Sequence, residues 1–421
     1  MAVSSLFLAV LALPQQDPGA PAPGVEGFLD SLRAHAAPRR AAAREAWKSF
    51  GPLYLEKPGE DTIAPLLAAA PEIQEPALEE LAAASAAAAS ERVAALVALL
   101  GASMNAAGAE SLAALVPALP VGEQAPAIEA VVARGGAATV AGAERWLLEG
   151  APAQRAAALS ALLAHAPIER APGWLAHPAT AQLDGTAVGA ALERLAARPL
   201  PETLRLPAAL YQRREGALVA PLLGVLQRAP DPDTEAFLIR VLEQPGRDRD
   251  TRLSALAALE RGSQAFHWRD GEKRLEQLLE QKPPDPLSEP FAWTLHRLGN
   301  KTGTRFLLAV PQAAVKSNPR SWRNRFALGR TLVELGDWTE AYTHFAEGVD
   351  LVEDTPNFSN VRREDWLYAA RAAAGARRLR DAAAWLEASE MSPVELEAYR
   401  ALPEFAPLLD RQPFKRLFGL E

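Results

Sequence analysis

The chain has 421 residues, no cysteine and a formal net charge of −8, and these properties exclude several classes of protein. A chain without cysteine forms no disulfide, uses no thiolate nucleophile and binds no zinc through cysteine. Nucleic acid selects a concentrated basic face, which an acidic chain without a polybasic tract does not offer. Alanine and leucine supply most of the 49% hydrophobic content, and aromatic residues make up only 6%. Because alanine and leucine favour helices and strand-favouring residues are scarce, we expect an all-α fold that binds no nucleic acid.

The first 24 residues have the features of an export signal. Residues 6–13 are apolar but too few to span a bilayer, and a stretch rich in proline, glutamine and glycine follows them. We therefore expect a signal peptide and linker in 1–24, export to the periplasm or the extracellular space, and no membrane span in the mature chain. The alternative is a cytoplasmic protein with a frayed N-terminus, since no lysine or arginine precedes the apolar stretch.

Residues 25–59 predict an N-terminal helical cap, and residues 60–287 predict a series of short helices separated by proline and glycine. In one helical pair, Ala143–Leu148 ends at Gly150-Ala151-Pro152 and a second helix begins near Arg155. This arrangement resembles HEAT repeats, which implies that the hairpins stack into a continuous core. Residues 174–200 fit the pattern least well, and we expect a loop or an irregular repeat there.

The strongest pattern lies between Trp322 and Asp354, where two amphipathic helices are predicted to meet at a glycine turn. Small residues stand where the helix backbones must meet, and large ones stand where each helix fills its neighbour's groove. The positions are Leu328, Gly329, Gly336, Trp338, Ala341 and Phe345. A second copy follows with Trp366, Ala382 and Leu386 at equivalent positions. The pattern resembles tetratricopeptide (TPR) repeats, although Arg325 and Leu332 replace the usual tryptophan and tyrosine. We therefore expect an α-solenoid, an α-α superhelix whose HEAT-like hairpins continue into TPR-like hairpins and a capping helix in 288–421.

The resemblance to TPR proteins also implies a binding groove lined by the first helix of each hairpin. On that face we expect Arg323, Phe326, Arg330, Leu367 and Arg371. Three guanidinium groups around an apolar floor would bind an acidic or C-terminal peptide, because arginine pairs bidentately with carboxylates. Alternatively, these arginines are solvated surface residues, some of them paired with Glu334 or Glu364.

No catalytic, cofactor or metal motif stands out in the sequence. The six histidines include no pair at i, i+4, and no phosphate-binding loop or Gly-x-Ser-x-Gly motif is present. The densest polar and aromatic cluster is His267-Trp268 with Arg269-Asp270, and a turn explains it better than an active site. We expect a scaffold or adaptor that is not an enzyme, needs no cofactor and presents a groove to a protein or peptide. Two alternatives stay open: a HEAT-like lyase or other enzyme with an unrecognised site, and a purely structural component of an envelope complex.

Overall fold

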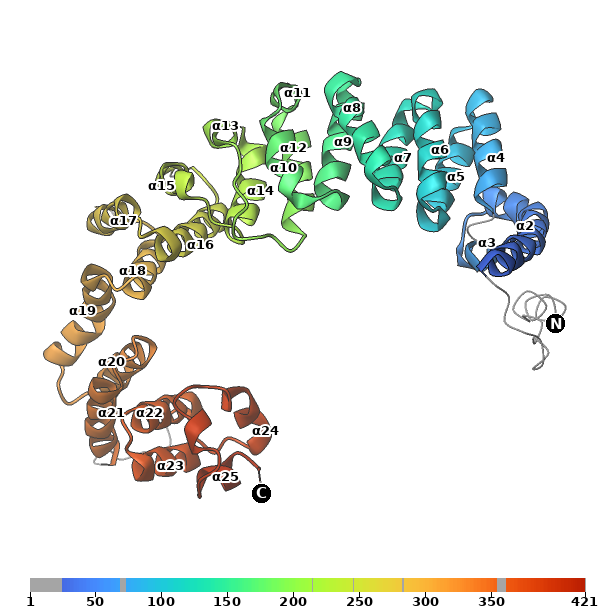
Figure 1. The fold of residues 1–421 in the computed structure, drawn as a ribbon. Helices are drawn as coiled ribbons and strands as arrows, with labels where there is room; N and C mark the ends of the chain where they lie inside the picture. Colours follow the sequence, from blue (N-terminus) through green and yellow to red (C-terminus); the bar gives the residue numbers. More distant parts are fainter. Residues whose placement is uncertain are drawn as a thin grey trace. The chain divides into compact units, whose positions relative to one another are not determined.

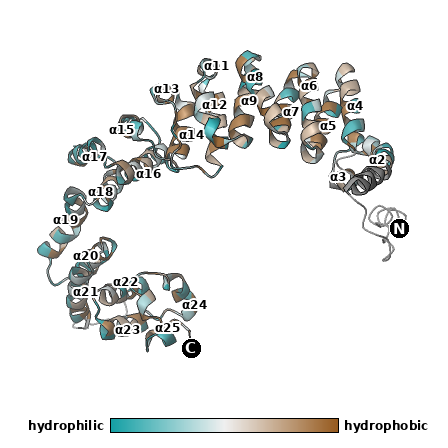
Figure 2. Ribbon diagram, viewed as in Figure 1, coloured by the Kyte–Doolittle hydropathy of each residue, from teal (hydrophilic) through white to brown (hydrophobic). Residues whose placement is uncertain are grey.

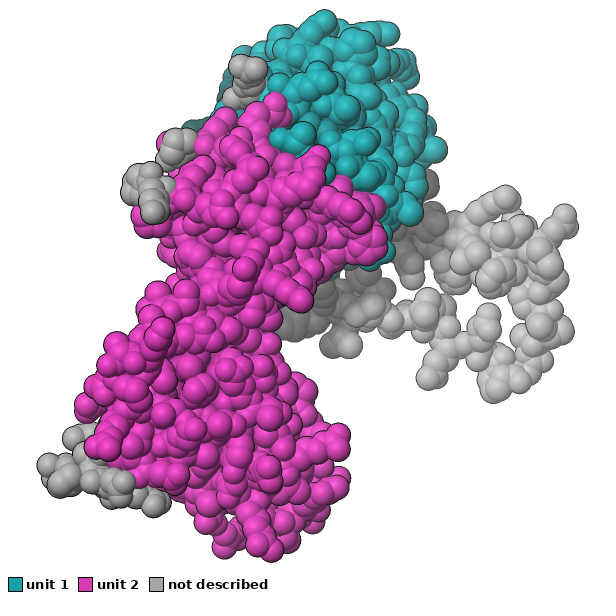
Figure 3. All heavy atoms as spheres, turned by 90° about the vertical axis from the view of Figure 1, so that its left-hand side faces the viewer, with its two compact units in different colours: residues 1–237 teal, residues 238–421 magenta. Residues whose placement is uncertain are grey.

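The computed structural model describes residues 25–68, 73–213, 215–244, 246–281, 284–353 and 361–420, and within these ranges it contains helices and no strand. Consecutive helices pack against each other along the chain, so the predicted all-α solenoid is confirmed (Figure 1). The chain divides into two compact units, 1–237 and 238–421 (Figure 3). The boundary predicted between the two kinds of repeat, at 287/288, lies within the second unit. The expected signal peptide in 1–24 lies outside the described residues.

The first unit is a stack of two rows of helices. In one row α5, α7, α9, α12 and α14 lie side by side, and in the other α4, α6 and α8 do so. The region predicted to be irregular consists of two short helices, α10 and α11, followed by α12. The α-helices of this unit are α2 (Val25–Glu56), α3 (Glu60–Ala68), α4 (Gln74–Ala86), α5 (Ser90–Ser103), α6 (Ala106–Leu115), α7 (Val121–Arg134), α8 (Ala137–Glu149), α9 (Pro152–His165), α10 (Ala171–Ala176), α11 (Pro178–Ala181), α12 (Gly185–Ala196), α13 (Ala208–Gln212) and α14 (Gly216–Leu226), with the short 3-10 helices η1 (Val116–Ala118), η2 (Ile168–Arg170) and η3 (Pro232–Thr234).

Local sequence explains where several of these helices begin and which side they bury. Asn105 and Asp184 accept hydrogen bonds from backbone N–H groups in the first turns of α6 and α12, at 3.0 and 2.8 Å. Such caps satisfy donors that have no partner within the helix. Apart from Val121 at the start of α7, the leucines and valines of α5, α7 and α9 are buried, and these helices carry brown, hydrophobic segments in Figure 2.

A repeated arginine contact ties neighbouring helices of the main row together. At or just after the end of a helix, an arginine donates to carbonyl oxygens at the end of the preceding helix in the row. These pairs are Arg134 with Gly101 and Ala102, Arg198 with Leu163, and Arg228 with Ala196. The last carbonyls of a helix have no intrahelical donor, so each contact satisfies groups that would otherwise depend on water. Because the contact recurs between successive helices, it also fixes their spacing.

Glu129 of α7 joins three helices of the row. It accepts hydrogen bonds from His165 of α9, at 2.6 Å, and from Arg194 of α12. The bond from His165 is the main cause that lowers the pKa of Glu129, and Arg194 adds to it. A carboxylate whose folded-state pKa is depressed stabilises the fold above its unfolded-state pKa, and that contribution is lost as pH falls through the folded-state value.

We therefore expect Glu129→Gln to weaken the acid dependence of the urea midpoint between about pH 6 and pH 3. The exposed Glu193→Gln is the control and should leave that dependence unchanged; equal slopes for Glu129→Gln and the parent would contradict the assignment.

The second unit begins within α15 (Glu235–Glu243) and continues as pairs of packed helices. Its further α-helices are α16 (Arg249–Phe266), α17 (Asp270–Glu280), α18 (Ser288–Arg297), α19 (Lys301–Ser317), α20 (Trp322–Glu334), α21 (Trp338–Glu353), α22 (Arg363–Gly375), α23 (Leu379–Ala388), α24 (Pro393–Leu396) and α25 (Phe414–Leu417), with the 3-10 helices η5 (Glu397–Tyr399) and η6 (Ala406–Leu408). The helices α20 with α21 and α22 with α23 are the two hairpins predicted from the sequence.

In the hairpin of α20 and α21, a glycine of each helix lies against a phenylalanine of the other. A Cβ atom on Gly329 would lie 2.7 Å from the ring of Phe345, and one on Gly348 would lie 2.6 Å from the ring of Phe326. Each helix thus supplies a glycine that admits the other helix's ring. Gly336, with φ of 77°, makes the turn between the helices, a conformation that favours glycine.

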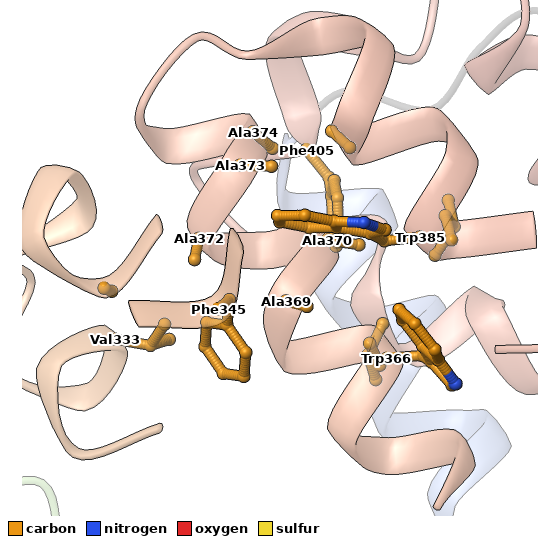
Figure 4. Close-up of a cluster of buried hydrophobic side chains, with 14 of the residues drawn as sticks. Val333, Phe345, Trp366, Ala369, Ala370, Ala372, Ala373, Ala374, Trp385 and Phe405 are labelled. Atoms are coloured by element: carbon orange, nitrogen blue, oxygen red, sulfur yellow. The ribbon is translucent and has the colours of Figure 1, made fainter. Parts of the chain in front are cut away.

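The other predicted packing positions lie in the same core. Leu328, Ala341, Phe345, Trp366, Ala382 and Leu386 are buried, and Trp338 is partly buried and packed against this core. A Cβ on Gly375 would lie 2.4 Å from the Trp338 ring, so a third aromatic side chain packs over a glycine. In Figure 4, the rings of Phe345, Trp385 and Phe405 lie around the alanine-rich helix α22. Small residues on α22 therefore allow close approach of its neighbours, as the sequence predicts.

Candidate functional site

The two apolar residues expected on the groove floor lie in the core instead. Phe326 is 1% exposed and Leu367 is 2% exposed. The Phe326 ring lies between Phe345, at 5.1 Å between ring centroids, and Trp366, at 6.2 Å. The prediction of an exposed floor is wrong for both residues, because α22 packs directly on α20 and covers the face on which a peptide was expected.

Two of the three expected groove arginines form ion pairs within the protein. Arg330 Nη1 donates to Asp365 of α22 at 2.7 Å. Arg371 donates from Nε to Glu404 at 2.6 Å and from Nη1 to Glu334 at 3.1 Å. The pairing with Glu334 agrees with the alternative interpretation of these arginines. Since the chain's own carboxylates hold both guanidinium groups, neither is available to a peptide in this conformation.

Arg323 differs from the other two arginines. Its guanidinium lies over the Trp322 ring, with Cζ 4.8 Å from the ring centroid. The residue is exposed, and no described carboxylate forms an ion pair with it. Arg323 lies at the start of α20, six residues after the end of α19.

Helix α19 presents an apolar stripe to solvent. Phe306 is 38% exposed and Val310 is 78% exposed, and Ala309 and Ala313 are also exposed. At about 100° per residue these four positions share one side of the helix. Leu308 and Val315 lie on the opposite side, against the core of the two hairpins. Gly303, at one edge of the stripe, is buried where α19 meets α18. An exposed apolar stripe on a helix held in place from behind is typical of a surface that binds another chain.

Positive charge surrounds this stripe. Residues 290–333 contain eight lysines and arginines and no aspartate or glutamate. Because the whole chain carries −8, the remaining residues carry −16. Five of the eight cations, Lys301, Arg305, Lys316, Arg320 and Arg323, are exposed and form no ion pair with a described residue. On the helical wheel Arg305 and Lys316 fall along one edge of the apolar stripe.

Sequence reasoning missed this surface although a sequence signal exists for it. Residues 301–421 contain 17 basic and 17 acidic residues, so charge averaged over that length is zero. A shorter window would have shown the acid-free block at 290–333. The sequence does not predict that Phe306 and Val310 are exposed, because apolar residues at helical spacing usually indicate a buried face.

Within the described residues, no helix is long and apolar enough to cross a membrane. Comparison of the chain with known protein families found no matching family, and comparison with curated proteins found no match.

Proposed function

We propose that this protein is a non-catalytic scaffold whose HEAT-like and TPR-like repeats hold a binding surface for an acidic, amphipathic segment of a partner protein. We also propose that it acts outside the cytoplasm, on the basis of the apolar segment at 6–13. The observation that carries the binding proposal is the exposed stripe of α19 beside cations without carboxylate partners. The rest of the chain is acidic and would repel a negatively charged partner, whereas the cations beside α19 would attract one.

The chemistry of the surface defines the partner. Phe306 and Val310 offer apolar contact at positions i and i+4, the spacing with which one helix packs along another. Arg305 and Lys316 lie along the edge, where acidic side chains flanking the partner's apolar face would meet them. A partner helix with leucines on one side and glutamates on the other satisfies both requirements.

A pair of designed peptides tests the proposal with the full-length chain. One peptide is an 18-residue helix with leucines on one face and glutamates on the other, and the second has lysine in place of every glutamate. By fluorescence anisotropy, we expect the acidic peptide to bind at least tenfold more tightly than the basic one, which corresponds to about 1.4 kcal/mol. Binding of the acidic peptide should weaken with added salt, because its charged contacts are exposed. Equal affinity for the two peptides would overturn the proposal.

Two matched substitutions locate the site. Val310→Asp is expected to weaken binding of the acidic peptide at least tenfold, because it places a carboxylate in the apolar stripe. Val394→Asp is the control, since Val394 of α24 is 79% exposed, like Val310, but lies away from α19 in the sequence and in the fold. A similar loss with both variants would show that the peptide does not use this surface.

Charge reversal provides a second comparison. The double variant Arg305→Glu/Lys316→Glu should bind the acidic peptide more weakly and the basic peptide more tightly than the parent. The control double variant Arg411→Glu/Lys415→Glu should bind both peptides as the parent does.

Sedimentation of the parent and Val310→Asp should give the same mass. A parent dimer that Val310→Asp dissociates would assign the stripe to a second copy of the chain and reject the foreign partner. Turnover of a substrate by the purified chain would reject the non-catalytic assignment.

A further inference from the structure

A polar cavity of about 440 Å³ lies in the second unit, apart from the α19 stripe. Its walls are the end of α16, the first half of α17 and the end of α18, together with the turn between α16 and α17. Nearly every lining residue is polar or charged, and Leu298 supplies the one aliphatic side chain. The volume falls within the range of small-molecule sites. Charged side chains in the lining can form charge-assisted hydrogen bonds with a ligand of opposite charge.

The cavity belongs to a tightly held turn. Trp268 is buried, and a Cβ on Gly262 would lie 2.0 Å from its ring, so the indole packs directly on the α16 backbone. His267 ends α16 with φ of 55°, a left-handed conformation that is uncommon for residues other than glycine. This turn directs Trp268 inward and leaves His267 and Arg269 on the wall of the cavity.

Two of the charged groups that line the cavity have hydrogen-bond partners within the protein. Arg297 donates from Nε and Nη2 to both oxygens of Glu260, at 2.6 and 2.7 Å. Glu276 accepts hydrogen bonds from Asn300 at 2.9 Å and Thr302 at 3.1 Å. The contacts of Arg297 join α18 to α16, and those of Glu276 join α17 to the start of α19, so the walls are held in position.

The remaining charges leave one cation and one anion without a partner. Arg269 and Glu272 both line the cavity, and neither forms an ion pair or a side-chain hydrogen bond with a described residue. Lys273, the other lining cation, lies 3.8 Å from Asp270. The hydroxyl of Ser263 is buried in the wall and also has no hydrogen-bond partner among the described residues.

We propose that this cavity binds a small zwitterion, either a free α-amino acid or a dipeptide. Arg269 binds the ligand's carboxylate, because a guanidinium donates two parallel hydrogen bonds to a carboxylate. Glu272 binds the ligand's ammonium group. The amide of Gln264 lies on the same wall and can hydrogen-bond to the ligand's peptide or side-chain polar atoms. The site is independent of the proposed partner surface on α19.

Three dipeptide probes test each half of this recognition by isothermal titration calorimetry on the full-length chain. They are Ala-Ala with both termini free, N-acetyl-Ala-Ala with only the carboxylate, and Ala-Ala amide with only the ammonium group. We expect the free dipeptide to bind at least tenfold more tightly than either blocked form. Indistinguishable heats for the three probes, or no binding of the free dipeptide at 10 mM, the highest concentration tested, would overturn the proposal.

Two substitutions assign the roles to named residues. Arg269→Gln should abolish the preference for the free carboxylate, so that Ala-Ala and its amide bind alike. Glu272→Gln should abolish the preference for the free ammonium, so that Ala-Ala and the acetylated form bind alike. A residue that only supported the walls would weaken all three probes together, and that result would reject its role. Arg320→Gln, an exposed arginine outside the cavity, is the control and should leave the order of affinities unchanged.

Discussion

Replacement of Gly329 with alanine or leucine is expected to lower the free energy of unfolding by about 1–3 kcal/mol. A Cβ at this position would lie 2.7, 2.8 and 3.1 Å from three ring atoms of Phe345, and the first two distances are shorter than real Cβ atoms show. The ring has little room to retreat, because Phe345 is fully buried and its other neighbour, Phe326, is in turn held against Gly348. Urea denaturation followed by circular dichroism, with hydrogen exchange on α20 and α21, measures the loss.

Gly142→Ala is the control for this prediction. Gly142 lies within α8, and a Cβ there would meet no atom within 4 Å. Alanine has the higher helix propensity, so this substitution should raise stability by up to about 1 kcal/mol. Opposite signs at two helical glycines would separate packing from propensity. A Gly329→Leu protein that melts within a degree of the parent would show that α20 and α21 can move apart without cost.

The hairpin of α20 and α21 could be predicted because its packing depends on spacing along the sequence. Gly329, Ala341 and Phe345 occupy positions that bring two adjacent helices into contact, and the turn at Gly336 follows from the same pattern. Neighbouring helices joined by a short turn have few ways to pack, so local pattern and final structure agree. The same reasoning explains why the all-α character was evident from the composition.

The predicted groove depended on contacts that the sequence pattern does not contain. Whether Phe326 faces a peptide or the core is decided by how α22 lies on α20, and these helices are separated by a whole hairpin. One of the two partners of Arg371 is Glu404, a buried residue of the C-terminal segment. A helical wheel identifies an apolar face, but only the tertiary structure shows what covers that face.

The α19 surface could be predicted only in part from the sequence. Its charge was readable from the sequence in a short window, whereas the exposure of Val310 was not. Apolar residues on a helix usually mark the core, and the exception here arises because α18 and α20, which pack on α19, leave Val310 uncovered. A block without acidic residues that overlaps an amphipathic helix therefore indicates a binding surface better than either pattern does alone.

Loss of the buried ion pair between Arg252 and Asp285 is expected to have the largest effect on the second unit. Both side chains are mostly buried, at 7% and 14% exposed, and Nη2 of Arg252 lies 2.6 Å from Oδ2 of Asp285. Arg252 also donates from Nε to the carbonyl of Leu242 at 2.9 Å, and its guanidinium lies 5.8 Å from the ring centroid of Phe291. Arg252→Met is expected to cost about 3–5 kcal/mol, because it leaves a buried carboxylate without its cation. Urea denaturation gives the global loss, and hydrogen exchange on α16 locates it.

A second substitution separates the loss of the charge partner from the loss of packing. Asp285 also accepts a hydrogen bond from the backbone N–H of Leu287 at 2.8 Å, and asparagine can retain that bond through its carbonyl oxygen. Asp285→Asn added to Arg252→Met removes the unpaired charge, so the double variant should be more stable than Arg252→Met alone. A coupling energy of about 0.5–3 kcal/mol is expected for two residues in direct contact. Additive losses would mean that the guanidinium stabilises the unit through Leu242 and Phe291 and that the carboxylate contributes little. The ion pair matters because it connects the start of α16 to the segment that leads into α18.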